Sequence, residues 1–315
     1  MKITVLDAAT LGDDIDLSPL KKYGEVAIFP TSDDDEIADH IGDSDFVLVN
    51  KNKLNEKTVG KAPNLKLICI AATGYDNVDL EYMKSRGIGV CNVVGYSTDS
   101  VAQLTLSMAF SLATHLPEYN SFVESGEYSK SVAANKLSPV FHELAGKTWG
   151  VVGLGNIGRK VATVANAVGC HVIANKRTPT ADFECTDIDT LCKTADIISV
   201  HTPLNDSTRG LISKERIAMM KNDALFINVA RGAVCDEKAL CEAVKEGRLG
   251  GIGVDVYTGE PFREDSPYYE IRNYPNVCLT PHMAWGSYEA RVRCLNDMMK
   301  SIDSYLAGEK YSRLV

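Results

Sequence analysis

Residues 150–158 read GVVGLGNIG, and this short stretch indicates a strand, a tight turn and a helix in succession. An apolar run ends in a glycine-rich turn, and the amphipathic segment of residues 156–169 follows at once. In such a turn one glycine permits the tight bend, one lets a ligand approach the backbone, and one lets helix and strand pack closely. The N–H groups that open the helix bind phosphate. The pattern predicts a dinucleotide site. Its expected contacts are Gly153, Gly155, Asn156, Ile157 and Gly158.

The next expected strand, residues 171–178, reads HVIANKRT and ends on cations. Such a strand usually ends on an Asp or Glu that binds the ribose hydroxyls of NAD. Here those positions hold Asn175, Lys176, Arg177 and Thr178. Arginine and lysine bind phosphate oxygens, and Asn and Thr add neutral hydrogen bonds. We therefore predict NADP as the preferred cofactor. NAD is the alternative if the loop is only a solvated basic surface.

Short apolar runs alternate with amphipathic segments through the first ninety-odd residues and again from about residue 147. This alternation predicts parallel sheets with helices on both faces. The final helical segment, from about residue 287, has no strand of its own and must cover an apolar face elsewhere. We predict an α/β protein of two doubly wound parallel-sheet domains. A Rossmann coenzyme domain, residues 99–283, is inserted into a flavodoxin-like substrate domain, residues 1–98 plus 284–315.

The composition narrows the choice of partners. The 315 residues carry a formal net charge of −9, which speaks against binding to nucleic acid or to an anionic membrane. The nine cysteines form no CxxC pair and no zinc-like cluster with histidine, so we expect reduced thiols and no metal site. The first residues contain no apolar core of signal-peptide length. We therefore expect a cytoplasmic protein.

Polar residues follow three further apolar runs. Arg231 follows ALFINVA, Asp255 and Glu260 surround the end of GIGVD, and His282 follows NVCLTP. The carboxyl ends of parallel strands line the ligand crevice of such a sheet. Reduction of a keto acid needs a cation for the carboxylate and carbonyl and an acid for the oxygen. A neighbouring carboxylate favours the charged form of an imidazole. Each residue alone could equally be structural, so the combination carries the hypothesis.

The motifs, taken in order, resemble those of the D-isomer-specific 2-hydroxyacid dehydrogenase family. The resemblance spans nearly the whole chain, through ATGYDNVDL, GYSTDSVAQ, GVVGLGNIGR, HTPLNDSTRGLI, INVARG, VDVYTGEP and TPHMAW. The stretch NVVGYSTDSVAQ and the Trp285 after PHMA resemble the glycerate dehydrogenase (hydroxypyruvate reductase) branch in particular.

This resemblance implies a role for each matching residue. Arg231 would bind the substrate, His282 would be the acid and base, and Glu260 would pair with it. Asp255 would hold the nicotinamide carboxamide. The backbone of Thr73, Gly74 and Tyr75 would hold the substrate carboxylate. Further cofactor contacts are implied at Thr98, His201, Pro203, Val229, Ala230, Arg231 and His282. The resemblance also implies a homodimer with its active site in the cleft between the two domains.

We therefore expect NAD(P)H-dependent reduction of a small 2-keto acid, with hydroxypyruvate or glyoxylate favoured, to the D-2-hydroxy acid, and the reverse oxidation. Tyr75 is bulky, so a dehydrogenase for a bulkier D-2-hydroxy acid is one alternative. A formate-type dehydrogenase lacks the Glu partner of the histidine, so Glu260 speaks against it. A nucleotide-sensing protein that resembles the corepressors of this fold would keep Arg, Glu and His, and it stays open as a binding protein rather than an enzyme.

Overall fold

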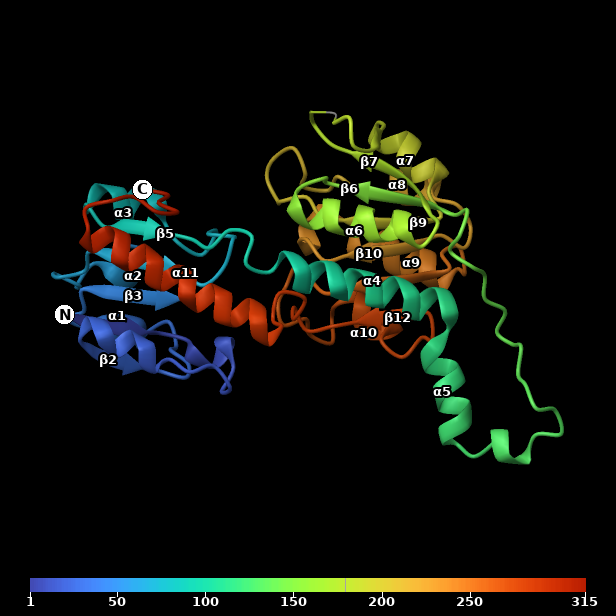
Figure 1. Ribbon diagram of the computed structural model, residues 1–315, viewed down its shortest axis with the longest axis horizontal. Helices are drawn as coiled ribbons and strands as arrows, with labels where there is room; N and C mark the ends of the chain where they lie inside the picture. Colours follow the sequence, from blue (N-terminus) through green and yellow to red (C-terminus); the bar gives the residue numbers. More distant parts are fainter. Residues whose placement is uncertain (179) are drawn as a thin grey trace. The chain divides into compact units, whose positions relative to one another are not determined.

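The computed structural model describes residues 1–178 and 180–315. The chain forms two compact units (Figure 1). Unit 1 comprises Met1–Ser97 and Gly286–Val315, and unit 2 comprises Thr98–Trp285. Each unit has its own parallel sheet, of five and of seven strands, which confirms the predicted class of two parallel-sheet α/β domains. The assignment of substrate binding to one unit and coenzyme binding to the other stays a prediction.

The sheet of unit 1 has the strand order β2-β1-β3-β4-β5. Its strands are β1 Lys2–Val5, β2 Glu25–Ile28, β3 Phe46–Val49, β4 Leu67–Ile70 and β5 Gly89–Cys91. The order 2-1-3-4-5 is that of flavodoxin-like sheets. Every residue of β3 and β4 is buried, because layers of chain cover both faces of the sheet.

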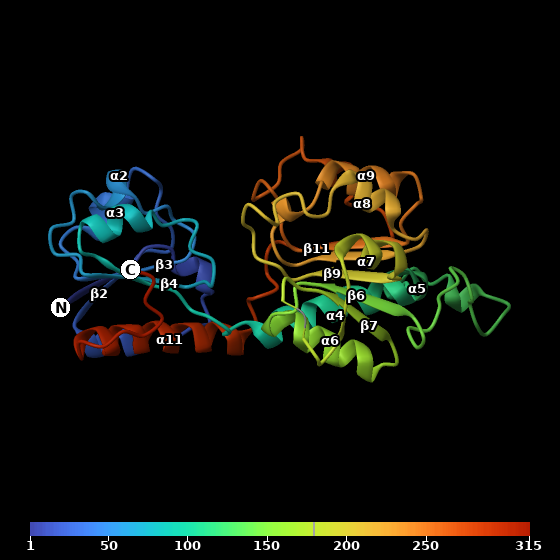
Figure 2. The same cartoon turned by 90° about the horizontal axis from the view of Figure 1, so that it is seen from above.

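Helices of unit 1 lie on both sides of this sheet (Figure 2). They are α1 Ile37–Ile41, α2 Glu56–Val59, α3 Leu80–Ser85 and α11 Tyr288–Leu306, with the 3-10 turns η1 Ala8–Leu11 and η2 Ser18–Tyr23. Helix α11 packs against β4, where the thiol of Cys69 approaches the carbonyl oxygen of Met298 at 3.9 Å. The last helical segment therefore packs on the sheet of unit 1. Such packing is what we expect of an amphipathic helix that has no strand of its own to cover.

The sheet of unit 2 has the order β12-β11-β10-β9-β6-β7-β8, and all its pairs are parallel. Its strands are β6 Thr148–Val152, β7 His171–Asn175, β8 Glu184–Cys185, β9 Ile197–Val200, β10 Leu225–Asn228, β11 Gly251–Val254 and β12 Val277–Leu279. The chain first adds strands on one side of β6 and then on the other, so β6 and β9 flank the switch point. In doubly wound folds, ligands bind at the carboxyl ends of the strands there.

Two helical layers cover the sheet of unit 2, with α4 and α6 on one face and α7, α8 and α9 on the other (Figure 2). The elements are α4 Thr98–Thr114, α5 Leu116–Glu124, η3 Tyr128–Lys130, α6 Asn156–Ala167, α7 Ile188–Thr194, α8 Lys214–Met219, η4 Gly232–Val234, α9 Glu237–Lys245 and α10 Pro267–Ile271. Helix α4 lies against α6, β10 and β11, as expected for a buried helix. Among the described residues, no helix has the length and apolarity needed to cross a bilayer.

Candidate active site

The glycine turn after β6 has the geometry of a phosphate cradle. Gly153 has a φ of +94°, a conformation that L side chains rarely adopt. A Cβ at Gly158 would lie 2.1 Å from the carbonyl oxygen of Gly153, so helix α6 reaches the strand only with glycine there. A Cβ at Gly155 would meet nothing within 4 Å, so the space beside this position is open. Gly155 supplies no side-chain cap to α6, which leaves its first N–H groups for a ligand. The turn therefore fits a dinucleotide.

The end of β7 places the predicted basic loop beside this turn. The carbonyl of Asn175 accepts a hydrogen bond from the Gly153 N–H at 2.9 Å. The side-chain amide of Asn175 donates to the carbonyl of Thr186 at 3.0 Å, so it is partly committed to the protein. Lys176 is half-buried and Arg177 is exposed. Within residues 1–178 and 180–315, neither cation forms a salt bridge, so both charges are available to an anion.

His201 follows β9, directly beside the glycine turn. A Cβ at Gly153 would lie 2.8 Å from the carbonyl carbon of His201. The Nε2 atom of His201 lies 2.9 Å from the hydroxyl of Ser199, and that hydroxyl accepts a bond from the indole N–H of Trp149 at 2.9 Å. Burial lowers the pKa of His201 to about 3, so its ring is neutral near pH 7. The motif predicted His201 but neither Ser199 nor Trp149. A polar residue inside the otherwise apolar strand IISV was the available signal.

Arg231 follows β10 on a loop that Asn228 holds. The buried amide of Asn228 donates to the Arg231 carbonyl at 3.0 Å and accepts from the Ala230 N–H at 3.0 Å. The guanidinium of Arg231 donates to the carbonyl of Ala230 at 2.8 Å. It forms no salt bridge with any carboxylate that the structure describes. A half-buried guanidinium without a carboxylate partner is suited to bind an anionic ligand.

The loop after Arg231 packs directly on the loop that carries Glu260. A Cβ at Gly232 would lie 2.2 Å from the backbone nitrogen of Thr258. The backbone N–H of Thr258 is held in turn by the carboxylate of Glu237 at 2.8 Å. These contacts connect the chain segments that carry two of the predicted catalytic residues.

Glu260 and His282 form the contact that the resemblance implies. The Nδ1 atom of His282 lies 2.6 Å from Oε2 of Glu260. The other carboxylate oxygen of Glu260 accepts from the Tyr257 N–H at 2.9 Å. His282 has a φ of +52°, and its carbonyl accepts from the indole N–H of Trp285 at 3.1 Å. The Nε2 atom of His282 has no hydrogen-bond partner in the described chain. One ring nitrogen is thus oriented by a carboxylate, and the other is available to a ligand.

Asp255 lies beneath this histidine and is completely buried. Its carboxylate accepts from the Thr280 hydroxyl at 2.6 Å, the Met283 N–H at 2.9 Å and the Ala284 N–H at 3.0 Å. Burial raises the pKa of this carboxyl, while the hydrogen bonds and the nearby His282 oppose the rise. In this arrangement Asp255 fixes the loop on either side of His282. The contact of Asp255 with a nicotinamide carboxamide stays a prediction.

The remaining residues predicted to bind cofactor lie around the same unit. Thr98 is the first residue of α4, Pro203 is an exposed residue two positions after His201, and Val229 and Ala230 connect β10 to Arg231. Their cofactor contacts, like that of Thr178 in the basic loop, stay predictions.

Thr73, Gly74 and Tyr75 belong to unit 1, on the loop after β4. The hydroxyl of Thr73 donates to the Val93 carbonyl at 2.7 Å, and the Asn92 amide donates to the Thr73 carbonyl at 2.7 Å. The loop is therefore held through its carbonyl and hydroxyl groups. The backbone N–H groups of these three residues have no hydrogen-bond partner among the described residues, so they are free to bind an anion.

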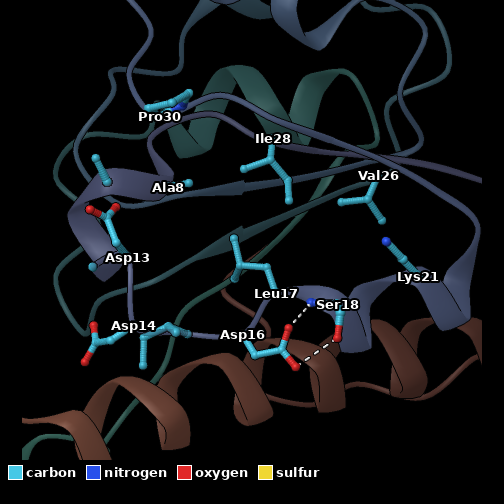
Figure 3. A pocket seen from close by; sticks show the side chains of 13 residues that line it. Ala8, Asp13, Asp14, Asp16, Leu17, Ser18, Lys21, Val26, Ile28 and Pro30 are labelled. Atoms are coloured by element: carbon cyan, nitrogen blue, oxygen red, sulfur yellow. Dashed lines mark hydrogen bonds between the residues drawn. The ribbon is translucent and has the colours of Figure 1, made fainter.

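A separate hollow of about 590 Å³ lies in unit 1, beside η1, η2 and the edge strand β2 (Figure 3). Two of its three carboxylates form structural contacts, and the third, that of Asp13, is exposed. Asp14 pairs with Arg291 of α11, and Asp16 accepts from the backbone N–H and the hydroxyl of Ser18, each at 2.8 Å. None of the predicted site residues lines this hollow, so it is not the candidate active site.

Comparisons with known proteins agree with this geometry. Residues 106–284 match the family described as D-isomer specific 2-hydroxyacid dehydrogenase, NAD binding domain. A hydroxypyruvate reductase of Blautia hydrogenotrophica is 31% identical over 98% of both chains. A glyoxylate reductase of Thermococcus litoralis is 38% identical over 86% of this chain and 82% of its own.

A solved structure is also similar over its entire length. This is an acyclic imino acid reductase in complex with NADPH and D-Arg, with a TM-score of 0.88 and 30% identity over 100% of both chains. The family match covers more than half of the chain, and the motifs match in order. The chain therefore belongs to the D-isomer-specific 2-hydroxyacid dehydrogenases, a family of oxidoreductases, and within it to the branch of the hydroxypyruvate reductases and glycerate dehydrogenases.

Proposed function

We propose that this protein reduces a small 2-keto acid, with hydroxypyruvate or glyoxylate favoured, to the D-2-hydroxy acid with a nicotinamide dinucleotide, and catalyses the reverse oxidation. One observation carries the proposal. His282 has Nδ1 at 2.6 Å from Glu260 and a free Nε2, on a loop that follows a strand at the same sheet edge as the unpaired Arg231. An acid beside an anion-binding guanidinium is what reduction of a keto acid requires.

The residues divide the chemistry between them. The planar fork of Arg231 binds the substrate carboxylate and polarises the carbonyl. His282 delivers a proton from Nε2 to the carbonyl oxygen, while Glu260 orients the ring through Nδ1. When bound, the nicotinamide supplies the hydride for the keto carbon. In the reverse direction Nε2 accepts the hydroxyl proton.

We further propose that NADP is preferred over NAD. Lys176 and Arg177 support this, because they follow β7 where an NAD-specific strand would end in a carboxylate. Neither has an acidic partner in the part of the chain that the structure describes. A 2′-phosphate would gain two opposite charges there, whereas NAD would gain none.

The choice of substrate side chain is proposed from the loop after β4. Three free backbone N–H groups, at Thr73, Gly74 and Tyr75, support binding of the substrate carboxylate by this loop. Tyr75 is 44% exposed, so its side chain is free to contact a ligand. A substrate bulkier than hydroxypyruvate would use this contact, and it is the alternative within the same activity.

We propose that the protein is a homodimer located in the cytoplasm. Helix α5 and the chain that follows it extend beyond the layers of unit 2 (Figure 1), and α5 has no buried residue. This segment exposes many large apolar side chains, which are Leu116, Val123, Tyr128, Val132, Leu137, Val140 and Phe141. An exposed apolar surface of this kind favours association. The nine cysteines are free thiols and seven are buried, which supports a reducing compartment.

The assembly is tested by light scattering after size-exclusion chromatography. Wild type is expected at twice the monomer mass, and Val140→Asp is expected to shift it toward the monomer. Val168→Asp is the matched control, because Val168 is an exposed apolar residue of unit 2 outside this segment. A monomeric wild type, or equal masses for both variants, would contradict the proposal.

The activity is tested with purified protein, a panel of 2-keto acids, and NADH and NADPH in parallel. Hydroxypyruvate or glyoxylate with NADPH is expected to give the highest kcat/KM, and the chiral product is expected to be the D isomer. One arm adds ammonium, which converts part of the keto acid to the imino acid. This arm is included because one of the similar solved structures is an acyclic imino acid reductase. Dinucleotide binding without turnover of any panel member would instead support a nucleotide-sensing protein.

A further inference from the structure

We infer that Ser199, held by Trp149, fixes His201 in the neutral tautomer that carries its proton on Nδ1, and that this N–H donates a hydrogen bond to an oxygen of the bound dinucleotide. The inference deepens the proposed function and rests on it, because it takes the dinucleotide as the ligand. It assigns a positioning role to Ser199 and Trp149, and it specifies which atom of His201 binds.

Pairing of β6 with β9 places Trp149 and Ser199 on the same face of the sheet, on neighbouring strands. Val151 stands opposite Ser199 in the register, and Trp149 stands opposite Ile197. Trp149 and Ser199 are both completely buried. The indole Nε1 of Trp149 lies 2.9 Å from the Ser199 hydroxyl oxygen. An indole N–H is a donor only, so this oxygen must be the acceptor.

The position of the remaining hydroxyl proton decides the tautomer. The Ser199 oxygen also lies 2.9 Å from Nε2 of His201, and these two are its hydrogen-bond contacts among the described residues. A buried hydroxyl proton needs an acceptor, and Nε2 is the acceptor within reach. The Nε2 atom therefore carries no proton, and a neutral imidazole must then be protonated on Nδ1. The opposite tautomer would point two protons at the same oxygen and leave the hydroxyl proton unpaired.

The Nδ1 atom is buried and has no hydrogen-bond partner among the described residues. Such a buried donor costs free energy unless a ligand or water completes it. His201 lies at the carboxyl end of β9, where its backbone contacts the glycine turn at Gly153. Because this is the switch point of the sheet, the group expected to approach Nδ1 is an oxygen of the ribose or the pyrophosphate. Both NADH and NADPH offer these oxygens, so this bond does not discriminate between them.

The tautomer is tested directly by long-range ¹H–¹⁵N correlation spectra of the histidine-labelled protein, with His201 assigned by its loss in His201→Asn. The wild type is expected to show a protonated Nδ1 and an unprotonated Nε2, and the Nδ1 signal is expected to shift when NADPH is added. A protonated Nε2 would overturn the inference, and this result does not depend on the folding of any Ser199 variant.

Calorimetric titration with NADPH tests the role of the hydrogen bonds from Trp149 to Ser199 and from Ser199 to His201. This measurement does not rely on turnover. Ser199→Ala is expected to raise the Kd about 3- to 10-fold, the effect of losing the orientation of one hydrogen bond. Ser199→Thr keeps the hydroxyl and is expected to restore the Kd. His201→Asn offers an amide N–H near the position of Nδ1 and is expected to bind more tightly than His201→Phe. The matched control is Ser207→Ala, an exposed hydroxyl on the loop after β9.

The outcomes separate this inference from the proposed function. Wild type that binds no dinucleotide would overturn both. The wild type could bind NADPH and reduce keto acids while folded Ser199→Ala binds NADPH with an unchanged Kd. This result would overturn only the positioning role of Ser199 and Trp149. A weakened Ser199→Ala together with the Nδ1-protonated spectrum in the wild type would support it.

Discussion

The double variant Lys176→Asp with Arg177→Ala is expected to shift the cofactor preference from NADPH toward NADH. The first change places a carboxylate where ribose hydroxyls would bind, and the second removes the neighbouring cation. Both side chains follow β7 without a carboxylate partner in residues 1–178 and 180–315. No ion pair is therefore broken by the substitutions, and the effect reports on the ligand.

The expected magnitude follows from the burial of each side chain. Lys176 is half-buried, and a hydrogen bond from a charged group in such a place contributes about 1.5–2 kcal/mol. Arg177 is exposed, so its contribution is about 0.5–1 kcal/mol. The sum is about 2–3 kcal/mol, which corresponds to roughly a 30- to 150-fold fall in the ratio of kcat/KM for NADPH over NADH.

Steady-state kinetics with one saturating keto acid and either coenzyme measures this ratio. The matched control is Lys193→Asp with Arg248→Ala, which changes the charge equally and also removes the surface contact of Arg248 with Glu246 at 3.1 Å. Lys193 and Arg248 precede β9 and β11, so they lie at the amino ends of the strands, away from the switch point. The control is expected to leave the ratio within about twofold. An unchanged ratio in the Lys176 and Arg177 variant, or an equal fall in the control, would show that these two side chains do not select NADPH.

The other predictions concern Arg231, Glu260 and His201. Arg231→Ala is expected to raise KM for the keto acid and to lower kcat in steady-state kinetics. Arg231→Lys keeps the charge without the planar guanidinium and is expected to recover only part of the loss. Normal values of KM and kcat for Arg231→Ala would contradict this prediction. Glu260→Gln is expected to lower kcat by roughly 10- to 150-fold, because a charge-assisted hydrogen bond contributes about 1.5–3 kcal/mol, with the dinucleotide Kd unchanged. For His201, the folded pKa of about 3 lies below the ordinary 6.5, so its contribution to stability is present above pH 6.5 and is lost as the pH falls toward 3. Between pH 7 and 4.5 the wild type is expected to lose about 2–3 kcal/mol more unfolding free energy than His201→Asn, measured in urea. Equal losses would show that the ring is not held neutral.

Local patterns in the sequence predict the elements and much of the site. The turn of Gly153 and Gly158 is recognisable because each glycine meets a local steric demand. The unpartnered apolar face of residues 288–306 predicts that this helix covers another sheet, as α11 does on β4. The first two features depend on spacing along one or two neighbouring segments, which a sequence records directly. The contact of Glu260 with His282 is implied by the family resemblance of the motifs and not by local spacing.

Contacts between strands distant in sequence could not be predicted in the same way. The bond from Trp149 to Ser199 depends on the register of β6 against β9, which is a tertiary property. The enclosure of Asp255 depends on the loop after β12 folding back over it. The strand β8 is only two residues long, too short to give a periodic signal. The contacts of Trp149 and Asp255 join residues 50 and 28–29 positions apart in the sequence.

The central claim is that His282 protonates a keto acid whose carboxylate is bound by Arg231. The measurement compares the rate of NADPH consumption by the wild type and by His282→Gln. The substrate is hydroxypyruvate or glyoxylate, whichever the wild type turns over faster, and the Kd for NADPH is measured in parallel. His282→Gln is expected to lower kcat by about 10²- to 10⁴-fold while NADPH still binds. A His282→Gln protein that turns over at the wild-type rate would contradict it.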